Sequence, residues 1–280
     1  NSVISKSDIV SNKNDSIYNI SNANFKIEFN TKTGEIITLN YGDDNVLKKG
    51  IKPNFWRATT DNDFGFKMPK KLSEWKEASN NQDLIAFEEN NSGKNVTVKA
   101  TYNLPAIKDA KVVMTYNISS DGTVNVHTEL KNVASSLPVL PRFGTNFMID
   151  ESYNAVSWFG RGPHENYQDR NTAALVGQYT SSVSDLYFPY IRPQENGYKT
   201  DTRWVKFTNS RGKGIQVTAN NYIGFSAHHQ YNSDFDAGET KQQRHTTDII
   251  KRDFVNINID MAQMGVGGDD SWSQKALPHK

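Results

Sequence analysis

The stretch "NFKIEFNTKTGEIITLNY", residues 24–41, decides the fold class of this chain of 280 residues. Apolar residues occupy alternate positions on both sides of Gly34, namely Phe25, Ile27, Phe29, Ile37, Leu39 and Tyr41. A period of two is typical of a strand with one buried face, and glycine permits the backbone conformations of a tight turn. The stretch therefore predicts a β-hairpin whose apolar face is buried.

The same alternation recurs along the rest of the chain. It is found at 96–102, 112–118, 124–130, 203–219 and 255–261, and the intervening segments contain turn residues. Strands with one apolar and one polar face pack as antiparallel sheets that cover each other. The pattern predicts an all-β chain built as a long sandwich.

Helical spacing is scarce. The best case is "PKKLSEWKEASN", residues 69–80, where Leu72, Trp75 and Ala78 share one face behind Pro69. We find no low-complexity linker and no internal repeat. The organisation predicted is a single β domain over residues 19–280, preceded by an extended lead-in over residues 1–18.

The composition excludes several classes of function. Lys plus Arg number 32 and Asp plus Glu number 31, a net charge of +1, so no global field attracts nucleic acid or an acidic membrane. The chain has no cysteine and no apolar run of the roughly 20 residues that a membrane helix needs. The polar start shows no signal peptide, and the compartment stays open between cytoplasm and periplasm.

Aromatic and polar residues concentrate in the loops between the predicted strands. Aromatic rings stack on the apolar side of sugar rings, while amides, carboxylates and basic groups bind hydroxyls, so this composition favours carbohydrate binding. Burial of the same aromatic residues at loop bases is the structural alternative.

Four of these blocks together resemble one known family. They are "KPNFWRATTDNDFG" (52–65), "GRGPHENYQDR" (160–170), "DLYFPYIRPQENGYKTDTRW" (185–204) and "MGVGGDDSWS" (264–273). Their order and content are similar to those of the small chain, the C-terminal domain, of glycoside hydrolase family 2 β-galactosidases. The resemblance implies an antiparallel supersandwich like that of galactose mutarotase.

The resemblance also implies a division of labour within a longer enzyme. Such enzymes hydrolyse β-galactosides such as lactose with retention, on an upstream (β/α)8 barrel that carries the nucleophile, the acid/base and the magnesium site. No catalytic residue, metal or cofactor is therefore expected in this chain, and Mg²⁺ and a monovalent cation are expected in the parent enzyme. The expected partners are the upstream domains, a galactoside and, in the full enzyme, further copies of itself.

One residue of this chain is expected to contact substrate. By its position in the "GGDDSW" block, Trp272 is predicted to be a stacking platform for the sugar and aglycone. Asp269 and Asp270 are predicted to tie the loop through its amides. Family members continue for about one more strand, so the final strand is expected to be missing here, which would expose a sheet edge.

The "RATTDNDFG" block contains two carboxylates in D-x-D spacing, Asp61 and Asp63. This spacing suits a hard cation, but calcium requires six or more oxygen ligands and no acidic loop follows. Internal pairing of Arg57 in an Asx-type turn is the preferred interpretation. Arg57, Asp61, Asn62 and Asp63 are predicted to lie behind the active site or at the barrel interface. The same position is predicted for His164, Glu165, Asp269 and Asp270.

Two histidine pairs leave an enzymatic alternative open. His164 adjoins Glu165, and His228 adjoins His229. A histidine with a glutamate could open a sugar ring by acid/base catalysis, as in an aldose 1-epimerase. Adjacent residues of a strand point to opposite faces, so buried, hydrogen-bonded histidines are the preferred interpretation. A non-catalytic carbohydrate-binding or assembly module is the third possibility.

Overall fold

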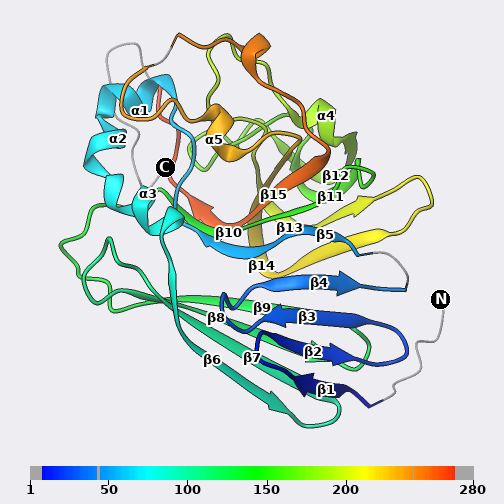
Figure 1. Cartoon of the computed structure of the whole chain (residues 1–280). Coiled ribbons are helices and arrows are strands. Elements are labelled where there is room, and N and C mark those ends of the chain that lie inside the picture. The colour runs from blue at the N-terminus through cyan, green and yellow to red at the C-terminus, as the bar shows by residue number, and fades with distance from the viewer. Residues whose placement is uncertain (1–7, 43–44, 242, 269–280) are drawn as a thin grey trace. The chain divides into compact units, whose positions relative to one another are not determined.

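The computed structural model describes residues 8–42, 45–241 and 243–268, and these form two compact units. The first unit comprises Asn1–Pro53 and Glu77–Leu137, and the second comprises Asn54–Lys76 and Pro138–Lys280. The described residues contain fifteen strands and only short helices (Figure 1). The predicted antiparallel all-β class is confirmed.

The first unit contains two antiparallel sheets of four strands. The first sheet has the order β1-β2-β3-β4, and the second has the order β6-β7-β8-β9. Their strands are β1 (Val10–Lys13), β2 (Ile17–Ser21), β3 (Lys26–Asn30), β4 (Ile36–Asn40), β6 (Asp83–Asn91), β7 (Asn95–Asn103), β8 (Lys111–Ser119) and β9 (Val124–Lys131). Strand β5 (Leu47–Asn54) ends at the boundary between the units.

Aromatic residues join the two sheets of the first unit. The ring of Phe29 in β3 lies 5.1 Å from that of Tyr116 in β8 and 6.2 Å from that of Phe87 in β6. The predicted hairpin is therefore present as β3 and β4, with Gly34 at a φ of 72° in its turn. Its apolar residues supply part of this core.

Two side chains of the predicted buried face of the hairpin, those of Ile37 and Tyr41, are exposed. Ile37 is 39% exposed, whereas Ile36 is fully buried. The register shifts after Glu28, so that Phe29 pairs with Ile36 while Glu28 pairs with Thr38. An extra residue in one strand reverses the alternation locally, which strict period-two spacing cannot anticipate. Residues 10–13, which lie within the predicted lead-in, form β1 and pair with β2.

The second unit contains six consecutive strands of one antiparallel sheet, in the order β12-β11-β13-β14-β15-β10. These strands are β10 (Arg142–Asp150), β11 (Ala155–Gly162), β12 (Leu175–Ser182), β13 (Lys199–Thr208), β14 (Gly214–His228) and β15 (Phe254–Gln263). Strand β15 lies between β14 and β10, so the end of β15 is placed beside the start of β10. The prediction of one domain over residues 19–280 stays a prediction.

Short helices lie in the connections between strands. They are α1 (Asp61–Phe66), α2 (Met68–Lys71), α3 (Ser73–Asn80), α4 (Val183–Leu186), α5 (Asn232–Phe235) and the 3₁₀ turn η1 (Thr246–Asp248). The predicted helix over 69–80 is divided at Leu72 into α2 and α3, and its predicted buried face, Leu72, Trp75 and Ala78, is confirmed. Among the residues described, no helix combines the length and apolarity needed to cross a bilayer.

Candidate functional site

The chain leaves β15 through a short run that we call the glycine segment, residues 265–268. Side chains from other parts of the second unit hold its backbone, and Gly267 and Gly268 have φ values of 68° and 80°. The bonds are Arg57 Nη2 to Gly265 O (2.9 Å), Asn62 Nδ2 to Val266 O (3.1 Å), Val266 N to Asp169 Oδ1 (3.2 Å), Gly267 N to Asp169 Oδ2 (2.8 Å) and Arg170 Nη2 to Gly268 O (3.5 Å). Two of the blocks singled out in the sequence, 52–65 and 160–170, therefore meet at the last one, 264–273.

Glycine at position 268 is required by its surroundings. A Cβ atom there would lie 2.7 Å from Asn62 Nδ2 and 2.9 Å from Arg170 Nη2. Together with the positive φ, this contact disfavours any side chain. The loop residues that follow are Asp269, Asp270 and Trp272, and these three predicted site residues lie outside the described residues.

Arg57 is held by a carboxylate within the same block. Both residues of the Arg57–Asp63 pair are fully buried, and Nη1 lies 2.5 Å from Oδ2. Burial opposes the charge of Arg57, but the attraction of Asp63 outweighs it and raises the pKa of the guanidinium. The Asp63 carboxylate also accepts from the backbone N–H of Thr60, the N-cap of α1, and so forms part of a capping box. The predicted internal pairing of Arg57 is confirmed.

The second carboxylate of the D-x-D pair points elsewhere. Asp61 is exposed and pairs with Arg192 (2.7 Å) and Lys241 (2.8 Å). Because Asp61 and Asp63 neutralise different cations, they do not share one site. Within the described residues, no group of three or more metal-binding acidic or histidine side chains is found.

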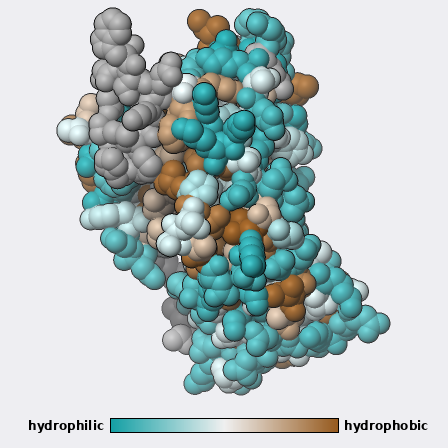
Figure 2. Space-filling view, turned by 90° about the vertical axis from the view of Figure 1, so that its left-hand side faces the viewer, coloured by the Kyte–Doolittle hydropathy of each residue, from teal (hydrophilic) through white to brown (hydrophobic). Residues whose placement is uncertain are grey.

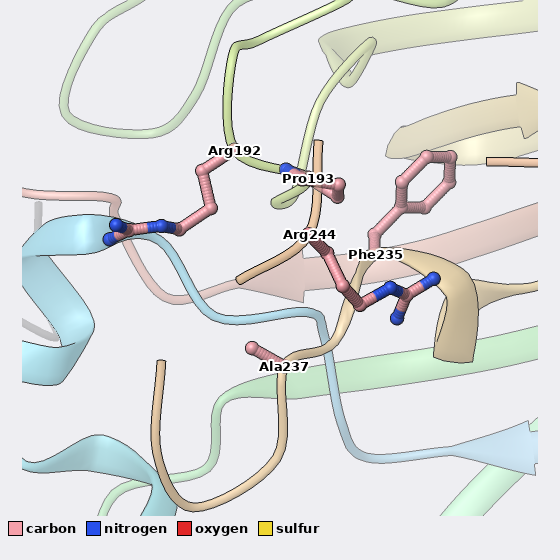
Figure 3. Close-up of a pocket in the computed structure, with 5 residues that line it drawn as sticks. All are labelled: Arg192, Pro193, Phe235, Ala237 and Arg244. Atoms are coloured by element: carbon pink, nitrogen blue, oxygen red, sulfur yellow. The ribbon is translucent and has the colours of Figure 1, made fainter. Parts of the chain in front are cut away.

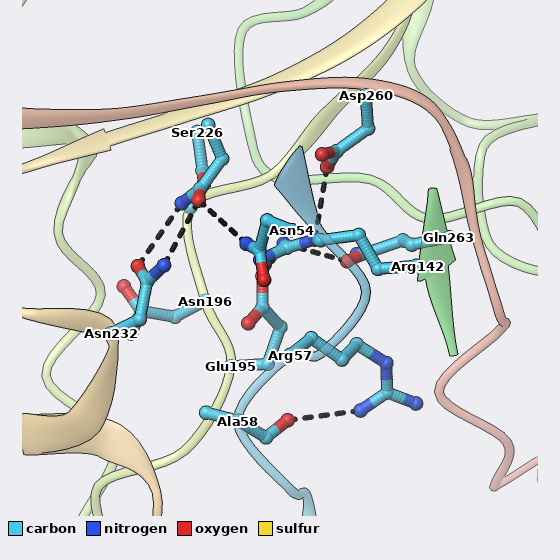
Figure 4. A network of polar contacts seen from close by, with 12 residues as sticks. Asn54, Arg57, Ala58, Arg142, Glu195, Asn196, Ser226, Asn232, Asp260 and Gln263 are labelled. Carbon is cyan, nitrogen blue, oxygen red and sulfur yellow. Dashed lines mark hydrogen bonds and ion pairs between the residues drawn. The ribbon is translucent and has the colours of Figure 1, made fainter. Parts of the chain in front are cut away.

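Arg142 is the centre of a second buried ionic group, drawn in Figure 4. Its guanidinium lies 3.0 Å from Glu195 and 3.0 Å from Asp260, and it donates to Gln263 Oε1 at 2.9 Å. Arg57 also attracts Glu195 electrostatically. Two guanidinium groups, those of Arg57 and Arg142, therefore lie among three buried carboxyl groups, those of Asp63, Glu195 and Asp260. One carboxyl group is therefore in excess.

The excess of carboxyl groups appears as raised pKa values. Burial raises the pKa of Asp260 to about 7, although Arg142 opposes the shift. Burial likewise raises the pKa of Glu195 against the attraction of Arg142 and Arg57. Since Asp260 and Glu195 compete for one guanidinium, Asp260 holds its proton at mildly acidic pH.

An Asp260→Asn variant is expected to remove a pH dependence of stability. Asp titrates at about 3.9 when unfolded and Asp260 at about 7 when folded, so between these values the folded chain binds more protons. Wild-type stability therefore falls as pH rises through this window, relative to the variant. Thermal unfolding of both proteins between about pH 4 and about pH 8 measures the difference. If the difference in stability between the wild type and the variant does not change with pH, Asp260 is ionised over the whole range measured.

In the described residues, the histidine side chains of both pairs have hydrogen-bond partners other than a glutamate or are exposed. His164 is exposed, whereas the Glu165 carboxylate accepts from Tyr190 Oη and, at 2.7 Å, from the Gly197 N–H. The pair lies in the loop between β11 and β12 and not in a strand.

The second histidine pair is buried and hydrogen-bonded, as predicted. His228 Nε2 lies 3.0 Å from Asn196 Oδ1, and His229 Nδ1 lies 2.7 Å from Phe254 O. Burial lowers the pKa of His228 to about 3, helped by the charge of Lys199. A histidine with this pKa stays neutral near pH 7 and is a poor proton shuttle there.

A small hollow lies beside the Arg192 loop, lined by Arg192, Pro193, Phe235, Ala237 and Arg244 (Figure 3). Its volume is about 10 Å³, room for about one water molecule. The Arg192 side chain extends from it toward α1, where it pairs with Asp61. A sugar ring is much larger than one water molecule, so the hollow is not a monosaccharide pocket.

Several residues of this site escaped the sequence analysis. Asp169 and Arg170 lie in a quoted block but carry no motif of their own, and Arg142 and Asp260 look like ordinary charged residues of strands. Their partners lie about 100 positions away in sequence, for example 97 positions between Asp169 and Val266. The alternation of residues 255–261 places Asp260 on the polar face with Asn256 and Asn258, yet these three residues are buried and Met261 of the apolar face is 69% exposed, so the sequence carried no signal for Asp260.

Comparison with known proteins gives consistent relatives. The family model of the β-galactosidase small chain matches residues 21–279. The β-galactosidase of Priestia megaterium is 32% identical over 275 residues, which cover 95% of this chain and 25% of that protein. The β-galactosidase of Vibrio cholerae is 34% identical over 268 residues, which cover 91% of this chain and 25% of that protein.

Likeness to solved structures is weaker. The structure of HI1317 aligns with 90% of this chain at 11% identity and a TM-score of 0.38. YeaD of Salmonella typhimurium, a mutarotase candidate, aligns with 91% at 12% identity and a TM-score of 0.33. Similarity at this level supports no conclusion about function. The chain spans about a quarter of the length of the curated relatives it matches. The family match over residues 21–279 shows that it belongs to the β-galactosidase small chain family.

Proposed function

We propose that the chain is the C-terminal domain of a retaining β-galactosidase and completes an active site built by an upstream (β/α)8 barrel. The substrates would be terminal β-galactosides such as lactose. The observation that carries the proposal is the family match over residues 21–279, in which the chain accounts for about a quarter of each relative. The remaining length of those relatives leaves room for a barrel of about 250 residues.

The state of the buried carboxylates supports a non-catalytic role for this chain alone. A retaining glycosidase needs two carboxyl groups about 5 Å apart that face the sugar. Asp63, Glu195 and Asp260 are instead buried against Arg57 and Arg142. The nucleophile and the acid/base, with any Mg²⁺ and monovalent cation, are therefore assigned to the upstream part of the enzyme.

Trp272 is the residue of this chain that we assign to substrate. The glycine segment, which precedes it by four residues, is anchored at every residue by side chains of the second unit. An anchored segment gives the following loop a defined starting point, which a stacking platform requires. The flat face of an indole suits the apolar side of a galactose ring.

Exposed apolar side chains support docking against other domains. Phe188 is 52% exposed and Ile191 is 84% exposed, both in the loop that precedes Arg192. Figure 2 shows hydrophobic patches among the hydrophilic residues of one face. Exposed apolar patches mark surfaces that bind other proteins or domains. We assign this loop to the contact with upstream domains.

Hydrolysis of a nitrophenyl β-galactoside tests the proposal. The chain alone and the separately expressed upstream part alone are expected to be inactive, and their mixture is expected to be active, because each lacks part of the active site. Activity of the chain alone, or an inactive mixture of folded parts, would contradict the proposal. Mutarotation of galactose by the chain alone would favour the epimerase alternative.

A further inference from the structure

Within residues 8–268, so far as the structure describes them, side chains and not strand pairing position the glycine segment. Strand β15 ends at Gln263, and Met264 N still bonds to Pro141 O at 2.8 Å. From Gly265 onward, the bonds that hold the backbone come from Arg57, Asn62, Asp169 and Arg170. The course of the chain as it leaves the sheet therefore depends on these four side chains.

Asp169 has a distinct place among the four. Each of its carboxylate oxygens accepts one of two consecutive backbone N–H groups, at 3.2 Å from Val266 and 2.8 Å from Gly267. Only a carboxylate offers two acceptor atoms in this arrangement, since an amide would present a donor to one of the N–H groups. Bonds of this charged kind are shorter and stronger than neutral ones. Asp169 thus fixes both the position and the direction of the segment.

The turn that carries Asp169 is itself anchored in the core. Arg170 N bonds to Tyr167 O at 2.8 Å, which closes the turn. The Tyr167 ring stacks on Tyr198 at 5.9 Å and 15°, and Val266 joins the same buried cluster. Side-chain packing and the Asp169 bonds therefore hold the turn and the glycine segment together as one body.

We infer that Asp169 is a positioning residue for the aromatic platform, acting on Trp272 through the backbone of the glycine segment. The inference rests on the proposed function of Trp272. A displacement of about 1 Å can cost a hundredfold in rate even when the changed residue is far from the reacting atoms. Loss of the two bonds is therefore expected to lower kcat/KM for galactosides, although no contact between Asp169 and the substrate is proposed.

The test uses the full-length enzyme that contains this chain. Asp169→Ala is expected to lower kcat/KM for a nitrophenyl β-galactoside by about tenfold or more, mainly through KM. Asp169→Asn keeps the shape and one acceptor, so it is expected to recover part of that loss. Asp248→Ala is the matched control, since Asp248 also accepts a backbone N–H, that of His245 at 2.8 Å, and its kcat/KM should equal that of the wild type.

A double-mutant cycle with Trp272→Ala separates positioning from general destabilisation. If Asp169 acts through Trp272, Asp169→Ala has little further effect on KM in the Trp272→Ala enzyme. Effects that multiply would overturn the inference, as would a normal KM in Asp169→Ala when Trp272→Ala is impaired. A normal KM in Trp272→Ala would instead overturn the proposed function, so the two failures are distinguishable.

Discussion

The Arg142→Met variant is expected to lose about 3–5 kcal/mol of unfolding free energy. Arg142 is the shared cation of Glu195 and Asp260, and all three side chains are at most 8% exposed. Methionine fills similar space but removes the cation that two buried carboxyl groups share, so that Glu195 keeps the more distant charge of Arg57 and Asp260 keeps the Tyr198 hydroxyl. Urea unfolding of the wild type and the variant near neutral pH measures the loss.

The Lys99→Met variant is the control for loss of an ion pair. Lys99 pairs with Glu88 at 3.1 Å, but the side chains are 44% and 61% exposed. Such a pair contributes about 0–1 kcal/mol. The loss of unfolding free energy in Arg142→Met is also expected to become smaller as pH falls toward about 4, because the two carboxyl groups then take up protons and no longer need a cation. A loss below about 1 kcal/mol, or one independent of pH, would contradict our account of the buried cluster.

The Trp272→Ala variant of the full-length enzyme is expected to lose about tenfold to a hundredfold in kcat/KM for β-galactosides. The reason is the loss of the flat apolar face on which we propose that the sugar stacks. The loss should appear mainly in KM, because stacking holds the bound sugar as well as the transition state. Initial rates with a nitrophenyl galactoside and with lactose measure it.

Trp272→Phe is the matched control, because phenylalanine keeps a smaller flat ring. We expect its kcat/KM to lie between those of the wild type and Trp272→Ala. Kinetics of Trp272→Ala equal to those of the wild type would show that the residue only packs within its loop. The carbohydrate-binding or assembly module would then be the preferred function.

Local patterns predicted the elements of the fold. Alternation of apolar residues predicted the hairpin of β3 and β4, and spacing of three predicted the buried face of Leu72, Trp75 and Ala78. Both signals depend on neighbours within a few positions. The exposure of Ile37 was missed because the register shift after Glu28 is set by pairing between two strands.

The site required the tertiary structure. The sequence places Asp61 and Asp63 two positions apart as one candidate pair, yet Asp61 pairs with Arg192 and Asp63 with Arg57. Helix α1, capped by Thr60, turns the two carboxylates toward different partners. The sequence likewise offered His164 and Glu165 as a pair, whereas Glu165 is bound by Tyr190 and Gly197.

By itself, the sequence determined the antiparallel β class, the main hairpins and, through four blocks, the family of the chain. Only the tertiary structure decided which charged residues meet, because these partners are brought together by the order of the strands. Strand β15 lies beside β10, which places Asp260 against Arg142, 118 positions earlier in the chain. Alternation reports which face of a strand is buried, but it carries no information about which strand lies next to it.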